Sequence, residues 1–344
     1  MGNETITVYD IAREAGVSPA TVSRVLTGNA KVSEDKRCRV QNIIKKYDFE
    51  PNSIARSLSK QESKTIGMIV PDIRNPFYST LFIECEMEAI QFGYNMILCN
   101  TINEIASEGG QLRNMMEKRV DAIIQVGGSV DEVAPDPQYI ELVDKVSKKI
   151  PTVIAGELEG ANVYRIISET THGMYDLMAY LSGLGHKEIA FIGGRASVIP
   201  TLRKRQALTQ FLKEQNIFLR PEFLIDTEYS IEGGYEAARK LLKLDHLPTA
   251  IIAVNESVAM GIVRALGEKK LRVPEDISIV GYDDTFYSEM ISPPLTCISY
   301  NLKSYAQMIM ETIIQIINKE DTEKIKYVPT YLAVRSSCKE LRES

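Results

Sequence analysis

The stretch TVYDIAREAGVSPATVSRVLTG, residues 7–28, contains two short helical patterns separated by a turn. One face of the first pattern carries the apolar residues Val8, Ile11, Ala12 and Ala15, at the i, i+3, i+4, i+7 spacing of a helix. We expect Thr7 to cap this helix and Gly16 to end it, because glycine tolerates the left-handed turn after a helix. Ser18-Pro19 then predicts the start of a second helix, since serine is a good N-cap and proline fits the first helical position. The stretch therefore predicts a helix–turn–helix.

The second predicted helix carries small polar side chains on its outer face. They are Thr21, Ser23, Arg24 and Thr27. Small side chains let a helix backbone approach the major groove of DNA, hydroxyls reach phosphates, and arginine pairs with guanine. The alternative is a structural helical hairpin whose polar face is merely solvated, and spacing alone leaves that alternative open.

Charge is distributed unevenly along the chain. Residues 13–60 contain ten Lys and Arg but only five Asp and Glu, a balance of +5. The whole chain is −6, so the remainder is −11. This basic segment includes a third predicted helix, from about Glu34 to Tyr47, and Pro51 closes the unit. A small basic head on an acidic body favours nucleic acid as the partner of the head.

Composition excludes several classes of protein. With 344 residues, 44% hydrophobic and 25% charged, the chain is long enough for two or three globular domains. No run reaches the roughly 18 apolar residues of a membrane span, and no secretory signal precedes the head, so we expect no membrane partner. The five cysteines are dispersed, without CxxC spacing. We therefore expect reduced thiols, no metal site, no cofactor and a cytoplasmic location.

From Lys64 onward, short apolar runs alternate with amphipathic segments of helical length. The predicted strands are 65–71, 94–100, 121–127, 151–156, 164–168, 188–194, 222–226, 249–254 and 277–283. A long apolar helix follows at 302–318. Such alternation predicts parallel sheets covered by helices on both faces, and the number of strands suggests two α/β lobes of roughly equal size.

Several ordered motifs resemble the lactose-repressor/galactose-repressor (LacI/GalR) family. Besides residues 7–28 they are NSIARSL (52–58), TIGMIVPDIRNPFYSTL (65–81), KRVDAIIQVG (118–127), GHKEIAFIGG (185–194), PTAIIAVNESVAMG (248–261), LRVPEDISIVGYDDT (271–285) and PPLTCISYN (293–301). The resemblance implies a helix–turn–helix domain at 1–51, a hinge at 52–63 and a periplasmic-binding-protein-like body at 64–344. It places the first lobe at about 64–161 and 292–320, and the second at about 162–291 and 321–344.

The same resemblance implies a homodimer on a pseudo-palindromic operator. Base-reading positions of the recognition helix correspond to Pro19, Ala20 and Arg24, of which Arg24 should carry most of the direct readout. Phosphate-contacting positions correspond to Thr7, Ser18, Thr21, Ser23, Asn29 and Ser33. Leu58 matches a hinge leucine that wedges into the minor groove and kinks the duplex. The alternative for Leu58 is an ordinary packed linker residue.

The body resembles sugar-binding proteins whose ligand lies at the carboxyl ends of strands, between the lobes. Positions that the family uses for its effector correspond to Asn75, Phe77, Tyr78, Ser168, Arg203, Asn255 and Asp283. Phe77 has the alternative of being a core aromatic. Ser168 replaces a frequent aspartate, Gln206 a usual glycine and Glu256 a usual aspartate. A carbohydrate, a sugar acid or its phosphorylated form therefore remain open as effectors, and so does a protein co-regulator.

No catalytic motif of the GxSxG, GxxxxGK[ST], HExxH or GxGxxG type occurs, so we expect no enzyme. His172, His186 and His246 are expected to be structural. The leading hypothesis is a transcriptional repressor of a carbohydrate-utilisation operon. One alternative is a global carbon-catabolite regulator controlled by a phosphoprotein partner. The other is a cytoplasmic sugar-binding protein, which would lack the head.

Overall fold

The computed structural model describes residues 6–26, 32–47, 49 and 62–341. The chain forms two compact units, Met1–Ser63 and Lys64–Ser344, which we call the head and the body. The boundary coincides with the change from helical to α/β pattern in the sequence.

The head contains three helices, α1 (Val8–Ala15), α2 (Pro19–Leu26) and α3 (Glu34–Lys46), in its described part. Thr7 and Asp10 form a reciprocal cap at the start of α1, and Gly16 ends the helix with φ 65°. The three helices share a small core of Ile11, Ala12, Ala15, Val22 and Val40. The predicted helices and the cap at Thr7 are therefore confirmed.

The body contains two six-stranded sheets. The first sheet has the order β11-β5-β4-β3-β1-β2, and the second β12-β10-β9-β8-β6-β7. All strand pairs are parallel except β10 with β12. The strands of the first are β1 (Thr65–Val70), β2 (Asn95–Asn100), β3 (Ala122–Val126), β4 (Thr152–Ala155), β5 (Tyr164–Ser168) and β11 (Ile325–Val328). Those of the second are β6 (Ile189–Ile192), β7 (Leu224–Ile225), β8 (Ala250–Ala253), β9 (Ser278–Asp283), β10 (Thr296–Ser299) and β12 (Tyr331–Ala333).

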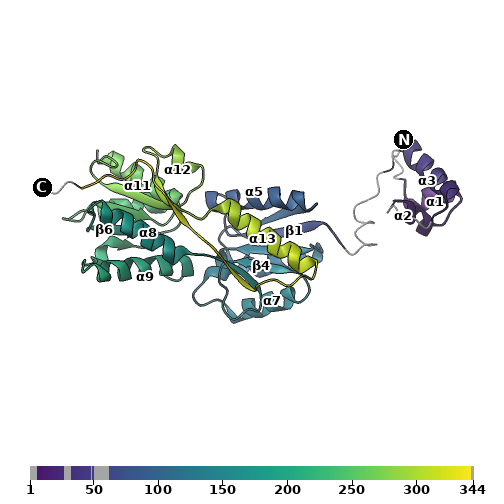
Figure 1. Cartoon of the computed structure of the whole chain (residues 1–344), viewed down its shortest axis with the longest axis horizontal. Coiled ribbons are helices and arrows are strands. Elements are labelled where there is room, and N and C mark those ends of the chain that lie inside the picture. The colour runs from purple at the N-terminus through teal and green to yellow at the C-terminus, as the bar shows by residue number, and fades with distance from the viewer. Residues whose placement is uncertain (1–5, 27–31, 48, 50–61, 342–344) are drawn as a thin grey trace. The chain divides into compact units, whose positions relative to one another are not determined.

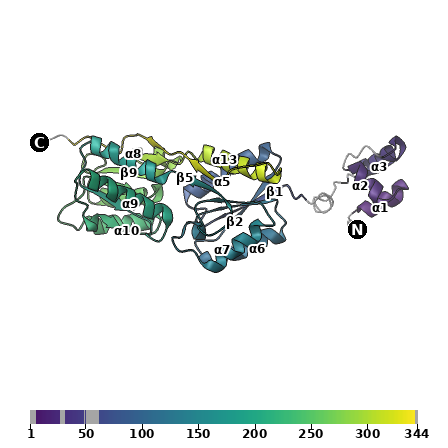
Figure 2. The same ribbon diagram turned by 60° about the horizontal axis from the view of Figure 1, so that its bottom comes forward.

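Helices cover both faces of each sheet (Figures 1 and 2). The first lobe has α5 (Pro76–Gln91), α6 (Ile105–Glu117), α7 (Pro137–Ser147) and α13 (Leu302–Ile317). The second has α8 (Thr170–Gly183), α9 (Ile199–Glu214), α10 (Ile231–Leu241), α11 (Glu256–Glu268) and the short α12 (Tyr287–Met290). Along β1, Met68 packs in the core that includes α5, whereas Ile69 packs in the core of α6 and α7. This alternation explains why strands buried on both faces appear as continuous apolar runs.

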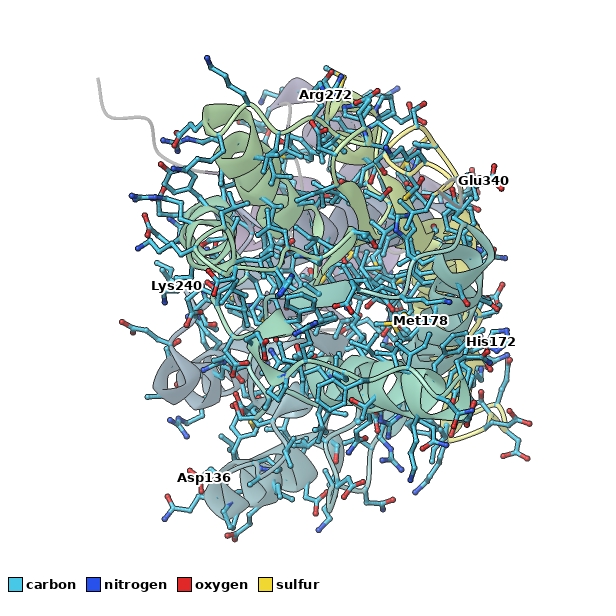
Figure 3. The ribbon with its side chains drawn as sticks, turned by 90° about the vertical axis from the view of Figure 1, so that its left-hand side faces the viewer. Asp136, His172, Met178, Lys240, Arg272 and Glu340 are labelled. Atoms are coloured by element: carbon cyan, nitrogen blue, oxygen red, sulfur yellow. The ribbon has the colours of Figure 1, made fainter. Side chains whose placement is uncertain are left out.

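In the second lobe, α8 illustrates how amphipathic spacing divides inside from outside. Met178 is fully buried, whereas the His172 side chain is 67% exposed and lies near Asp176. Figure 3 shows Met178 in the interior and His172 at the edge of the molecule.

The chain crosses between the lobes three times: after β5, after β10 and after β11 (Figure 1). The expected lobe boundaries are corrected by this arrangement. Residues 164–168 and 325–328 belong to the first sheet, whereas 296–299 belong to the second. An apolar run predicts a strand but not its sheet, because the run itself carries no signal for the strand with which it will pair.

Candidate functional site

Helix α2 presents the predicted base-reading residues on an exposed surface. Pro19, Ala20 and Arg24 are exposed, whereas Val22 is fully buried against the other two helices of the head. Thr21 and Ser23 are half-buried. A helix whose apolar side is buried in this way leaves its opposite face available to a groove.

The predicted phosphate-contacting residues lie mostly at helix starts. The Thr7 hydroxyl donates to Asp10 Oδ2 at 2.6 Å, and the Ser18 hydroxyl accepts from the Thr21 amide at 3.2 Å. Ser33 precedes α3 without a side-chain cap. Helix N-termini bind anions well, so these positions suit phosphate contact, which stays a prediction. Asn29 and Leu58 lie outside the described residues.

A cavity of about 770 Å³ lies between the two lobes of the body. Its wall is built from segments that follow parallel strands of both sheets: 71–78 after β1, 126–132 after β3, 195–204 after β6 and 254–257 after β8. The carboxyl ends of parallel strands are the usual place for a ligand in open α/β sheets, and this volume suits a small molecule.

The structure brings six of the seven predicted effector residues together at this cavity. Its lining includes Asn75, Phe77, Tyr78, Ser168, Asn255 and Asp283. The amides of Asn75 and Asn255 also cap helices, accepting from the backbone N–H of Phe77 and Val258 at 3.1 and 2.9 Å. The Phe77 ring contacts Tyr78 and Tyr300 edge-on at 5.2 and 5.5 Å between centroids.

Arg203, the seventh residue, does not line the cavity; the adjacent Lys204 does. The Arg203 guanidinium donates to the Glu157 carboxylate of the first lobe. On α9 the buried residues Thr201, Lys204, Leu208 and Phe211 follow a helical period, which turns Arg203 away from that face. Lys204 was not among the predicted effector residues, although the helical period of these buried positions places it on the same face.

Lys204 and Asp283 form the charged floor of the cavity. They are 3% and 5% exposed. Lys204 Nζ donates to the Val254 carbonyl at 3.2 Å and lies 3.8 Å from the Tyr282 ring centroid, a cation–π contact. Burial lowers the pKa of Lys204 and raises that of Asp283, and each charge partly offsets the shift of the other.

The first lobe contributes a group of three acidic residues to the wall of the cavity. It consists of Glu108, Asp131 and Glu157. Glu108 accepts from Gln125 Nε2 at 3.0 Å and from the Ser129 amide at 3.1 Å. Asp131 accepts no hydrogen bond from the described residues; burial and the charges of Glu157 and Glu108 raise its pKa to about 7. No local sequence pattern predicts these acids, because they follow different strands and meet only in the fold.

Polar contacts join the lobes at the rim of the cavity. Arg195 of the second lobe pairs with Glu132 of the first at 3.4 Å. The Val133 amide donates to the Ser197 carbonyl at 2.8 Å. With the Arg203–Glu157 pair, these contacts hold the two lobes together beside the cavity.

The remaining expectations concern the histidines, the cysteines, metal ions and membrane spans. His186 is buried, with Nδ1 2.9 Å from Thr249 Oγ1 and Nε2 3.1 Å from the Lys339 carbonyl. All five cysteines are free of disulfides. Within the described ranges, no group of His, Cys, Asp or Glu side chains could hold a metal ion. No helix in this part of the chain is long and apolar enough to cross a membrane.

Asp131→Asn should stabilise the body in a pH-dependent manner. The pKa of Asp131 is about 7 in the fold, against 3.8 ordinarily. The folded protein therefore keeps a proton that the unfolded chain has lost, and its stability falls as pH rises from about 4 to about 7. We expect the variant to gain about 1–3 kcal/mol in free energy of unfolding at pH 8 and almost nothing near pH 4.

Denaturant unfolding at both pH values measures this difference. Asp226→Asn is the matched control, because Asp226 pairs with Arg205 and does not line the cavity. A loss of stability in Asp131→Asn at pH 8, or an equal gain at both pH values, would show that the Asp131 carboxylate is well accommodated.

Comparisons with known proteins agree with these two sites. Residues 7–52 match the model of bacterial regulatory proteins, lacI family, and residues 178–338 match a periplasmic binding protein-like domain. Catabolite control protein A of Priestia megaterium is 33% identical over 97% of this chain and 99% of its own. The lac repressor dimer bound to operator and the anti-inducer ONPF is 25% identical, with a TM-score of 0.86 over 98% of this chain and 100% of that one. A LacI-family regulator of Enterococcus faecium with bound ribose is 27% identical, with a TM-score of 0.70 over 81% of this chain and 100% of that one. The chain belongs to the lacI family of bacterial regulatory proteins and is a DNA-binding transcriptional regulator.

Proposed function

We propose that this regulator binds a pseudo-palindromic operator as a homodimer and represses a carbohydrate-utilisation operon until a small ligand in the inter-lobe cavity changes its operator affinity. The observation that carries this proposal is the cavity itself, because residues from both sheets form its wall. A ligand bound to both walls changes the free energy of one lobe arrangement relative to another. It can shift operator affinity only by that difference. The protein acts in the cytoplasm, and no enzymatic step is part of the proposal.

An exposed apolar row on the first lobe supports the homodimer. Ile83, Met87 and Ile90 follow one side of α5 at i, i+4 and i+7, and they are 53%, 48% and 65% exposed. Contiguous exposed apolar surface of this kind is typical of an interface, and symmetric pairing is the commonest form of self-association.

A carbohydrate ligand is supported by the lining of the cavity. The lining provides hydrogen-bond acceptors in its carboxyl groups and in the side-chain amide of Asn75. It provides aromatic surfaces in the rings of Phe77 and Tyr78. The relative that binds ribose belongs to the same family. Such a mixture of polar and aromatic groups suits a polyhydroxylated molecule.

Carbon-catabolite regulation through a phosphoprotein is the second candidate. It is favoured by the similarity to catabolite control protein A. The two candidates differ in what changes operator affinity: a small molecule in the first case and a protein co-regulator in the second.

Arg24→Ala should weaken specific operator binding by about 1–3 kcal/mol, because it removes a bidentate contact to one base pair of each half-site. Arg24→Lys is the matched control, since it keeps the charge but not the fork geometry. We expect both variants to lose preference at the same base pair, and Arg24→Lys to keep more of the sequence-independent affinity. Selection from random duplexes followed by binding titrations measures this; an unchanged preferred sequence in Arg24→Ala would remove base reading from this residue.

Asp283→Asn should abolish the response of operator binding to the effector while preserving operator binding without it. The change keeps the side-chain shape but replaces the carboxyl group beside Lys204 with an amide that cannot ionise, far along the chain from the head. Operator titrations with and without each sugar of a carbohydrate panel measure the response. If the response persists unchanged in Asp283→Asn, or if no compound alters operator affinity in the wild type, the effector role of the cavity is wrong and the protein co-regulator takes its place.

A further inference from the structure

The cavity between the lobes carries more negative than positive charge. Eight of its lining residues are acidic and three are basic. Arg74 pairs with Asp72 at 2.7 Å and Arg195 pairs with Glu132 at 3.4 Å, so two of the three cations are neutralised within the wall. The third, Lys204, lies on the floor beside Asp283. None of the three basic residues therefore pairs with Glu108, Asp131 or Glu157 of the first lobe.

Asp131 is the centre of this imbalance. It is half-buried, lines the cavity and accepts no hydrogen bond from the described residues. The charges that act on it most strongly come from other carboxylates, Glu157 and Glu108. Of these, Glu157 has Arg203 as its partner, and Glu108 has the Ser129 amide. Among these three acids, only Asp131 has neither a cation nor a hydrogen-bond donor in the described part of the chain.

The backbone around Asp131 is shaped to keep these carboxylates close to the cavity. A side chain at Gly156 would overlap the Asp131 carboxylate, and one at Gly128 would overlap Glu108. Both glycines have positive φ, 157° and 67°, so the glycine at each position leaves the space that the carboxylate occupies.

An independent observation on the side of the cavity formed by the second lobe also points to a ligand. Asp283 is only 5% exposed, and its backbone has a φ of 95°. Its carboxyl group accepts no hydrogen bond within the described part of the chain. Tyr78 lies within electrostatic reach of both Asp131 and Asp283. Asp131 and Asp283 thus come from different lobes and line the same cavity as Tyr78, so a ligand in this cavity can meet carboxyl groups of both lobes.

We infer that the cavity takes an amino sugar, with its protonated amino group against Asp131 and its hydroxyl groups donating to acceptors that include Asp283. The inference rests on the proposed function, since it names the ligand class of the same cavity. An ammonium group supplies the missing charge and donors at Asp131, and the face of Tyr78 attracts a cation as well. A neutral sugar supplies no cation to Asp131, and a sugar acid or sugar phosphate adds repulsion to its carboxylate.

Calorimetry on the full-length protein with matched sugars tests this. For each of the gluco, galacto and manno configurations, the hexosamine is compared with its N-acetyl derivative, the parent hexose and the uronate. We expect one hexosamine to bind at least about tenfold more tightly than its three counterparts, because only the hexosamine carries a charged donor. Asp131→Asn should remove this preference, and Asp226→Asn, outside the cavity, should keep it.

The outcomes separate this inference from the proposed function. Equal or tighter binding of a parent hexose, an N-acetyl sugar or a uronate overturns the inference, whereas the proposed function stands if that sugar also shifts operator affinity. No binding by any hexosamine overturns it as well. A preference for the hexosamine that survives in Asp131→Asn overturns the role of Asp131. The order of sugar affinities measured on the wild-type protein decides whether the ligand is an amino sugar, even if a variant folds poorly.

Discussion

The parallel pairing of the strands is the constraint on which the ligand site depends. Because parallel strands all end at the same edge of a sheet, each lobe of the body collects its loops on one side. Three passages of the chain between the lobes, after Ser168, Ser299 and Val328, join the two sheets next to those edges. A cavity lined by residues from ten different segments follows from this arrangement without any single loop being long.

The same arrangement concentrates carboxyl groups that the protein cannot fully solvate. Asp131 and Asp283 are held in a partly or wholly buried state without hydrogen bonds from the described residues, and burial raises the pKa of each. Such groups reduce the stability of a fold at neutral pH. Buried carboxyl groups with raised pKa values and no hydrogen-bond donor are characteristic of functional sites, where a ligand supplies the missing partner.

Much of the architecture was predictable from sequence because it is encoded locally. The caps at Thr7 and Ser18, the glycine at 16 and the period of apolar residues define the head helices within a few residues of each. The long apolar runs likewise predicted strands such as β1 and β9. By contrast, β10, β11 and β12 were not predicted as strands. Residues of β11 and β12 are mostly not buried, so these strands lack a continuous apolar run, and β10 begins and ends with the polar residues Thr296 and Ser299.

The site was predictable only in part. Residues that follow directly from a strand or begin a helix, such as Asn75, Asn255 and Asp283, were placed at the cavity by the family resemblance. Arg203 and Lys204 are neighbours in sequence, yet the helical turn of α9 directs one to the rim and the other to the floor. The acidic group of Glu108, Asp131 and Glu157 joins segments that follow three different strands. No local pattern brings them together, so only the fold reveals it.

The central claim is that the first lobe contributes to the cavity a carboxyl group without a cation of its own. Carbon-detected NMR titration of the side-chain carboxyls, with Asp131 assigned from the signal lost in Asp131→Asn, tests it most directly. The account predicts that Asp131 titrates with a pKa of about 7 in the ligand-free protein, rather than at its ordinary 3.8. A midpoint near 3.8 would mean that the folded protein accommodates the carboxylate as well as water does, and would contradict the account.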